Sequence, residues 1–285
     1  MNRISSVREA GGSEGTVPFV GREKLGRFKF ARAYYWAKEP VVVQRLFSDS
    51  ELGLWSPGAL VEKVAGKKVR LKYNVQGVFD YNASASTGAV DTLEKEFREA
   101  AELILNHRFY YLQATSLKRE LPELLDSLMK PYLIDSRQLL LTCNLWFGGA
   151  GCKSPLHYDL PENFLIQTYG RKRVILYPPA AGQYLYPALD DALPHFSRVN
   201  VFGTEFSEFP LFTKAQSARR EFVIGPGDML YIPMGWWHAV ESLDTAVSVN
   251  MWWVSKARML FRWLLPRLMS KTGRNEIKKA MSIHA

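Results

Sequence analysis

The second half of the chain alternates short β-rich segments with turn signals, and this pattern restricts the fold more than any other feature. The turn signals are Gly148-Gly149, Tyr169-Gly170, Pro178-Pro179 and Gly225-Pro226-Gly227-Asp228. Many short strands separated by glycine and proline turns are typical of a β-sandwich or a β-barrel. We therefore expect strands at residues 139–146, 163–169, 172–177, 221–224, 229–232 and 246–253.

The first half of the chain mixes helical and extended patterns. Its apolar spacing predicts helices at residues 28–37, 91–106 and 122–129. Strands are predicted at 41–43, which is a run of valines, at 67–73, which alternates, and at 109–113, which is aromatic. We interpret the chain as a flexible leader (1–22), an N-terminal α/β elaboration (23–136), a barrel core (137–255) and a basic helical tail (256–285).

Cysteine content and hydropathy indicate the compartment. The chain has two cysteines, Cys143 and Cys152, which are too few for a disulfide framework and form no CxxC zinc motif. The first 19 residues are polar and lack the apolar stretch of a secretory signal. No segment approaches the roughly 18 apolar residues of a membrane span. We expect a cytoplasmic protein without a membrane span.

Positive charge is concentrated at the C-terminal end. The net charge is +9, and from Lys256 onward eight Lys and Arg residues accompany one Glu, which gives +7. The first 255 residues therefore carry only +2. A basic tail can contact nucleic acid, an acidic partner or a membrane surface, and it can also be a solvated helix face.

Three side chains suggest a metal site. His157 and Asp159 are two residues apart, so on an extended strand they point to the same side. His238 follows 79 residues after Asp159, which is far enough to return on another barrel strand. Two histidines and one carboxylate form the facial triad that binds non-haem Fe(II) and leaves positions open. A His-x-Asp pair alone is weak evidence, because it also arises as a simple hydrogen-bonded pair.

Strand alternation near the triad adds a candidate anion ligand. Asn163 and Gln167 have the same parity as His157 and Asp159, which places them on the same face unless a bulge intervenes. In the next segment, Lys172 lies on the face opposite its two arginine neighbours. An inward lysine is costly unless an anion satisfies it. The alternative, that Lys172 is the solvated residue, stays open because parity does not choose between the two faces.

The order and spacing of several separated motifs resemble the JmjC/cupin-like Fe(II) and 2-oxoglutarate oxygenases. The resemblance is to their hydroxylase branch, which includes a hypoxia-factor asparaginyl hydroxylase and a tRNA wybutosine hydroxylase. It covers residues 110–253 well and the N-terminal third only vaguely. The motifs are His157-Tyr158-Asp159, Asn163-Phe164, Gly170-Arg171-Lys172-Arg173, Gly227-Asp228, Tyr231-Ile232-Pro233 and Trp236-Trp237-His238.

The resemblance implies a mainly β fold, a double-stranded β-helix of the cupin type with flanking helices, and a catalytic site inside it. His157, Asp159 and His238 would be the iron ligands, and 2-oxoglutarate and O₂ would be co-substrates. Lys172 would pair with the distal carboxylate of 2-oxoglutarate. The other residues implied to bind the co-substrate are Ser154, where the family often has Thr, Tyr111, Asn163 and Asn250.

The same resemblance implies an oxygenase whose co-products are succinate and CO₂. Hydroxylation of an amino-acid side chain in a protein or peptide is the first expectation for the substrate. A tRNA base is the main alternative, and a small molecule or natural product is another. Lysine demethylation and a non-catalytic cupin rank below these. Similar hydroxylases pair through C-terminal helices, so the apolar residues of the tail suggest a homodimer.

Overall fold

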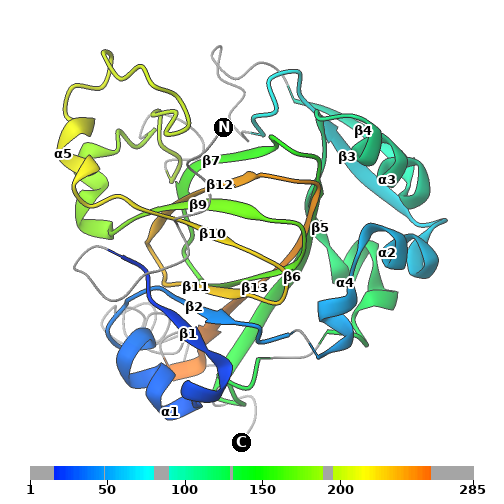
Figure 1. Cartoon of the computed structure of the whole chain (residues 1–285), viewed down its shortest axis with the longest axis horizontal. Coiled ribbons are helices and arrows are strands. Elements are labelled where there is room, and N and C mark those ends of the chain that lie inside the picture. Colours follow the sequence, from blue (N-terminus) through cyan, green and yellow to red (C-terminus); the bar gives the residue numbers. More distant parts are fainter. Residues whose placement is uncertain (1–15, 48, 80–89, 129–130, 189–194, 258–285) are drawn as a thin grey trace, which may run out of the picture.

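Two β-sheets face each other and form the centre of the protein (Figure 1). The computed structural model describes residues 16–47, 49–79, 90–128, 131–188 and 195–257. The large sheet has the order β1-β2-β11-β8-β13-β6-β5-β3-β4, and the small sheet has the order β10-β9-β12-β7. All pairs are antiparallel except β1 with β2, which are parallel. The predicted cupin-type, mainly β fold is confirmed.

The strands are β1 (Phe19–Gly21), β2 (Val41–Gln44), β3 (Lys68–Tyr73), β4 (Asp91–Glu96), β5 (Tyr110–Ser116), β6 (Gln138–Gly148), β7 (Lys153–Tyr158), β8 (Glu162–Tyr169), β9 (Lys172–Tyr177), β10 (Arg220–Ile224), β11 (Met229–Ile232), β12 (Trp237–Ser242) and β13 (Ala246–Ser255). The α-helices are α1 (Arg27–Phe30), α2 (Pro57–Val64), α3 (Phe97–Asn106), α4 (Leu117–Glu120) and α5 (Phe212–Gln216). Short 3₁₀ helices are η1 (Arg22–Lys24), η3 (Glu51–Leu54), η4 (Pro122–Leu124) and η5 (Pro179–Tyr184), and η2 (Ala31–Tyr35) is a π-helix.

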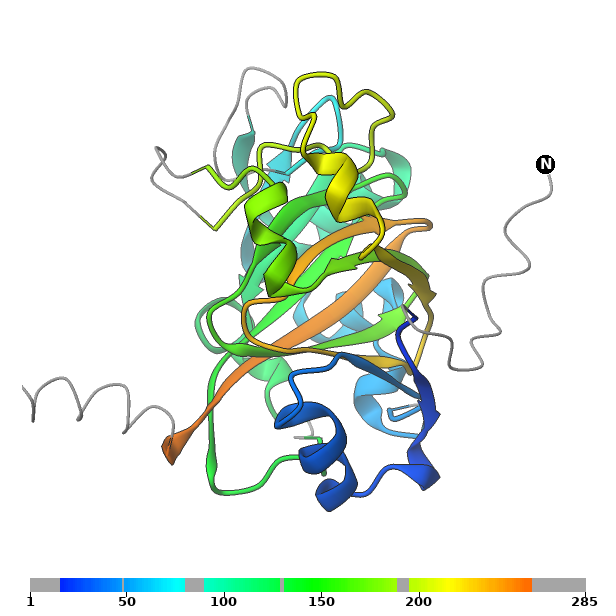
Figure 2. The same cartoon turned by 90° about the vertical axis from the view of Figure 1, so that its left-hand side faces the viewer.

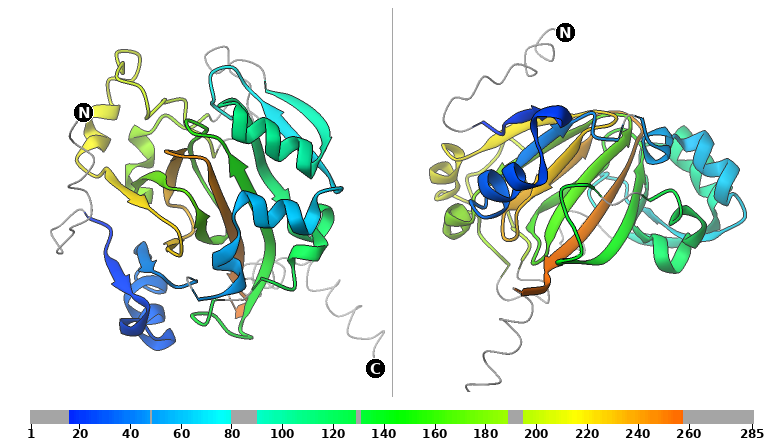
Figure 3. Two further views of the ribbon diagram at one scale, coloured as in Figure 1. Left: turned by 45° about the vertical axis from the view of Figure 1, so that its right-hand side comes forward. Right: turned by 90° about the horizontal axis from the view of Figure 1, so that it is seen from below.

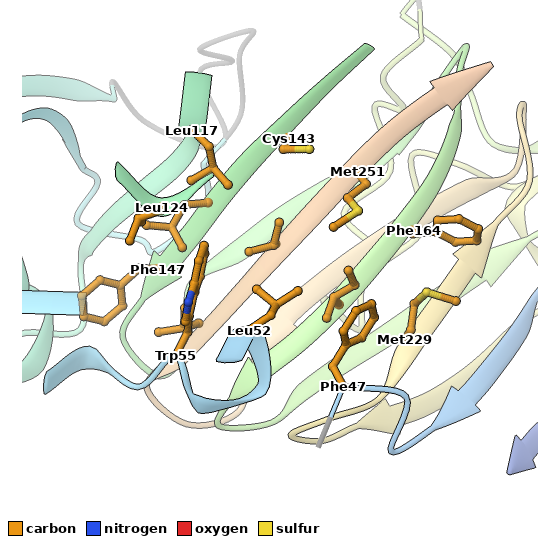
Figure 4. Close-up of a cluster of buried hydrophobic side chains, with 14 of the residues drawn as sticks. Phe47, Leu52, Trp55, Leu117, Leu124, Cys143, Phe147, Phe164, Met229 and Met251 are labelled. Atoms are coloured by element: carbon orange, nitrogen blue, oxygen red, sulfur yellow. The ribbon is translucent and has the colours of Figure 1, made fainter. Parts of the chain in front are cut away.

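Apolar side chains fill three layers around the two sheets. The outer face of the large sheet packs under α2, α3 and α4 through a cluster that includes Phe147, Phe164 and Met251 (Figures 3 and 4). A second cluster lies between the sheets and contains Leu165 and Val174. A third covers the outer face of the small sheet, where η5 and α5 pack (Figure 2). Alternate residues of each strand thus enter different layers, as the two-residue period requires.

Three of the secondary-structure predictions need correction. Residues 91–96 were expected to begin a helix, but they form β4, which pairs with β3 at the sheet edge, and α3 starts only at Phe97. Within 122–128 the structure has the short 3₁₀ helix η4 instead of a longer helix. Residues 19–21, placed in the leader by the sequence, form β1 beside β2. The strands β7 and β12 were not among the predicted segments.

The C-terminal tail from residue 258 onward lies outside the described residues, and so does the predicted dimer helix. None of the helices in the described parts of the chain has the length and hydropathy needed to cross a membrane.

Candidate metal centre and co-substrate pocket

The two neighbouring strands β7 and β12 bring the three candidate metal ligands together. His157 on β7 and His238 on β12 are direct cross-strand partners, and Asp159 follows one residue after the end of β7. The candidate ligand atoms of all three residues lie within 4.8 Å of one another. His238 Nε2 is 3.7 Å from Asp159 Oδ2, and the two imidazole ring centres are 4.2 Å apart.

Backbone carbonyls fix the tautomer of both histidines. His157 Nδ1 lies 2.8 Å from the carbonyl oxygen of Pro155, and His238 Nδ1 lies 3.1 Å from that of Trp236. A carbonyl oxygen only accepts hydrogen bonds, so each Nδ1 carries the proton and donates it. The lone pair of each imidazole is therefore on Nε2. This arrangement orients a metal-binding histidine and makes it a stronger ligand.

A neighbouring amide orients the third ligand. Asn163 Nδ2 donates a hydrogen bond to Asp159 Oδ2 (3.1 Å), while Asn163 Oδ1 is buried and has no partner among the described residues. Two Nε2 lone pairs and a carboxylate, all on one side, are the donors that suit Fe(II) with open coordination positions. The side chains present therefore fit the group that the sequence suggests.

Lys172 is buried in the wall of the same pocket. Its side chain is 1% exposed, whereas Arg171 and Arg173 turn outward and pair with Asp244 and with Glu221 and Glu241. The structure thus excludes the alternative in which Lys172 is solvated. Within the described chain Lys172 has no carboxylate partner; its Nζ donates to Ser248 Oγ at 2.6 Å. Burial lowers the pKa of Lys172 to about 7.

The other predicted co-substrate residues line the pocket with Lys172. Tyr111 on β5 has its ring centre 6.0 Å from Lys172 Nζ. Ser154 reaches the pocket because the register between β7 and β12 shifts between His238 and Val240. The full lining is Tyr111, Trp146, Ser154, His157, Asp159, Asn163, Leu165, Lys172, Ile232, His238, Val240, Asn250 and Trp252.

Sequence reasoning missed several residues of this pocket. Trp252 lines the pocket, and Ser248 contacts Lys172 beside it. Both have the same parity as Asn250 on β13, so strand alternation would have found them. Trp146 comes from β6, and its Nε1 donates to Asn250 Oδ1 (2.9 Å). The Nε1 of Trp252 is buried without a partner among the described residues.

Gln167, which was expected to face the interior, is buried but does not line the pocket. Its Nε2 donates to the carbonyls of Tyr169 and Gly170, so it supports the turn between β8 and β9. His195 packs against Tyr158 and Phe196, next to His157. Burial and the nearby His157 lower the pKa of His195, while Asp159 opposes this shift.

Comparison with known proteins agrees with this geometry. Residues 27–259 match the model of the cupin-like domain family. The chain is 38% identical over 146 residues to lysine-specific demethylase 8 of Xenopus tropicalis, covering 50% of this chain and 32% of the relative. It is 36% identical over 148 residues to lysine-specific demethylase JMJ30 of Arabidopsis thaliana, covering 52% and 34%. The chain therefore spans about a third of the length of these two relatives.

A third relative matches over more of the chain. The tRNA wybutosine-synthesizing protein 5 of Gallus gallus is 27% identical over 242 residues, covering 80% of this chain and 74% of the relative. The family match includes both sheets except β1, the candidate ligands His157, Asp159 and His238, and the lysine of the pocket. Other relatives are named as JmjC-domain proteins, and this chain belongs to the cupin-like domain family.

Proposed function

We propose that this protein is an Fe(II)- and 2-oxoglutarate-dependent hydroxylase that acts on an amino-acid side chain of a protein or peptide. The observation that carries the proposal is the pairing, in one pocket, of the His157-Asp159-His238 cluster with a buried lysine that has no carboxylate partner in the described chain. A metal site alone would not need that lysine. A dicarboxylate that reaches from the metal to Lys172 accounts for both features.

Each residue of the pocket has a role in this proposal. The two Nε2 atoms and the Asp159 carboxylate would hold Fe(II), and Asn163 keeps the carboxylate oriented. Iron with bound 2-oxoglutarate supplies the oxidising power for C–H hydroxylation by O₂, with succinate and CO₂ as co-products. The protein binds and orients the reactants and excludes water from them.

The lysine end of the pocket would hold the distal carboxylate of 2-oxoglutarate. Lys172 supplies the charge, Ser248 Oγ lies 2.6 Å from its Nζ, and Ser154 and Tyr111 line the same pocket. Charge-assisted hydrogen bonds in a buried site are stronger than those in water. Asn250, held by Trp146, lines the wall that continues toward the metal ligands.

A tRNA base is the second candidate substrate, and one surface favours it. Arg27, Phe28, Arg32, Trp36 and Lys256 line one groove, in which Phe28 is 81% and Trp36 is 67% exposed. Exposed aromatic rings beside cations suit single-stranded nucleic acid. The wybutosine-synthesizing relative supports the same idea. The charge of only +2 on the first 255 residues favours the peptide, because RNA binding usually needs a broad basic surface.

Other substrate classes would give different results in the same assays. Demethylation of lysine, suggested by the names of two relatives, would release formaldehyde. If the substrate is a small molecule, neither peptides nor tRNA would be hydroxylated. A homodimer formed through the basic C-terminal tail is part of the proposal as an expectation from the sequence. A cytoplasmic location is also proposed, since two cysteines are too few for a disulfide framework.

The experiment is an anaerobic calorimetric titration of 2-oxoglutarate into Mn(II)-loaded protein. We expect binding that requires the metal and weakens by at least about tenfold in Lys172→Ala, while Arg171→Ala, its exposed neighbour, binds as the wild type does. Absence of binding to folded, metal-loaded wild type would refute the oxygenase proposal. Succinate release with peptide libraries or with tRNA then separates the two substrate classes.

A further inference from the structure

A buried glutamate next to the metal centre takes no part in the proposed chemistry. Glu162 begins β8, three residues after Asp159, and its side chain is 3% exposed. Lys38 forms an ion pair with its Oε1, and the Tyr231 hydroxyl donates to its Oε2 at 2.7 Å. The backbone N–H of Met234 also donates to Oε2, at 3.0 Å. A carboxylate is retained at such depth only when it is fully bonded.

These contacts converge on the turn that leads into β12. Residues 233–236 precede His238, and the turn is held at three successive positions. Met234 N donates to Glu162, Gly235 N donates to the carbonyl of Asp159 (2.9 Å), and Trp236 Nε1 donates to the carbonyl of Lys38 (2.8 Å). The turn is thus tied to one metal ligand directly and to the start of β8 through Glu162.

This turn also orients His238. The carbonyl of Trp236 accepts the hydrogen bond from His238 Nδ1 (3.1 Å), so a shift of this carbonyl rotates the ring. Two hydrogen bonds, joined by the backbone from Met234 to Trp236, therefore connect Glu162 to His238. Lys38 belongs to the N-terminal elaboration, which links this segment to the metal site as well.

We propose that Glu162 is a positioning residue for the metal centre. Its carboxylate fixes the turn at Met234 against the Asp159 end of β7 and so sets how His238 and Asp159 face each other. It acts through its two acceptor contacts on Oε2, while the ion pair with Lys38 holds Oε1. The inference rests on the proposed metal centre.

The test compares two substitutions that differ in the acceptor. Glu162→Leu removes both contacts on Oε2, whereas Glu162→Gln keeps an oxygen for Met234 N and the Tyr231 hydroxyl. Lys38 is 30% exposed along its side chain and can turn to solvent in either variant. Substitutions around metal ligands change affinity by about 10- to 100-fold. We expect Co(II) to bind Glu162→Leu at least about tenfold more weakly and Glu162→Gln within about threefold of wild type.

A matched control separates positioning from general destabilisation. Thr168 is buried on the same strand, and its hydroxyl lies within hydrogen-bond distance of the carbonyls of Trp55 and Val247 (3.1 and 3.0 Å). Thr168→Val removes these bonds without touching the turn, so it lowers the urea midpoint but leaves Co(II) affinity unchanged. Trp236→Phe, which removes the bond to Lys38 and part of a buried ring that packs against Arg220, is the milder variant if Glu162→Leu does not fold, and we expect weaker Co(II) binding there too.

The measurements are calorimetric Co(II) affinity and the visible absorption spectrum of the bound Co(II), which reports its coordination geometry. An altered spectrum in Glu162→Leu, restored in Glu162→Gln, supports the proposal. The proposal would be overturned if Glu162→Leu had the Co(II) affinity and spectrum of wild type. It would also be overturned if Thr168→Val lost as much Co(II) affinity as Glu162→Leu. If Glu162→Leu does not fold, a Co(II) affinity of Trp236→Phe equal to that of wild type would overturn the proposal as well. Wild type that binds no Co(II) would instead refute the metal centre itself, so the two failures are distinguishable.

Discussion

In the proposed site, the buried lysine predicts that the affinity for 2-oxoglutarate depends on pH. Burial lowers the pKa of Lys172 to about 7, so the amine is charged below pH 7 and neutral above it. A bound carboxylate stabilises the ammonium, which raises the pKa in the complex. Binding above pH 7 must therefore include the uptake of a proton, and the affinity falls as the pH rises through 7.

The magnitude follows from the fraction of charged lysine in the free protein. With a pKa of about 7, the amine is about 90% charged at pH 6 and about 10% charged at pH 8, so the dissociation constant rises by about tenfold between these values. The proton taken up per ligand rises from about 0.1 to about 0.9 over the same range. Calorimetry at saturating Mn(II), in buffers of different ionisation enthalpy, measures both quantities.

Lys172→Arg provides the control, because a guanidinium stays protonated throughout this range. We expect its affinity to be independent of pH between 6 and 8.5, even if the larger side chain weakens binding overall. A wild-type dissociation constant that does not change with pH would refute the reasoning. A pH dependence that persists in Lys172→Arg would assign the titration to a different group.

Three further outcomes test the site and the fold. Asp159→Ala should weaken Mn(II) binding by more than about 100-fold and Asn163→Ala by about tenfold in calorimetry, because the first removes a ligand and the second only its orienting hydrogen bond. Gly170→Ala should lower the free energy of unfolding in urea by about 1–3 kcal/mol or more, because φ is +69° and a Cβ would lie 2.1 Å from the carbonyl oxygen of Thr245. Arg171→Ala should change that free energy by less than about 1 kcal/mol, because its ion pair with Asp244 is exposed; a larger loss would contradict this estimate.

Alternation of side chains made most of the barrel predictable from the sequence. The six expected strands in residues 138–255 coincide with β6, β8, β9, β10, β11 and β13 to within two residues at each end. On β9, Val174 enters the layer between the sheets and Ile175 enters the outer layer, as the period of two requires. The same period places Lys172 inside and Arg173 outside.

The errors arose where pairing between strands overrides local sequence preference. Residues 91–96 are rich in charge and have little β-propensity, yet they pair in register with β3 at the sheet edge. Edge strands rich in charge are common because they discourage pairing with other chains. The strand β7 contains Pro155 and a bulge, so its apolar residues do not alternate, and neither it nor β12 stood out.

The bulge that hid β7 from the sequence is also what completes the site. Ser154 and His157 are three residues apart, so regular alternation would send them to opposite faces. The register shift between His238 and Val240 lets both line the pocket, while Leu156 between them enters the outer apolar layer. Regular alternation was enough to put Asn163 on the same face as His157 and Asp159, whereas the face of Lys172 stayed open until the structure showed it buried, and Asn250 was expected only from the family resemblance. The strand that carries His157 departs from this rule because one short segment supplies both a histidine beside Asp159 and a serine that lines the pocket.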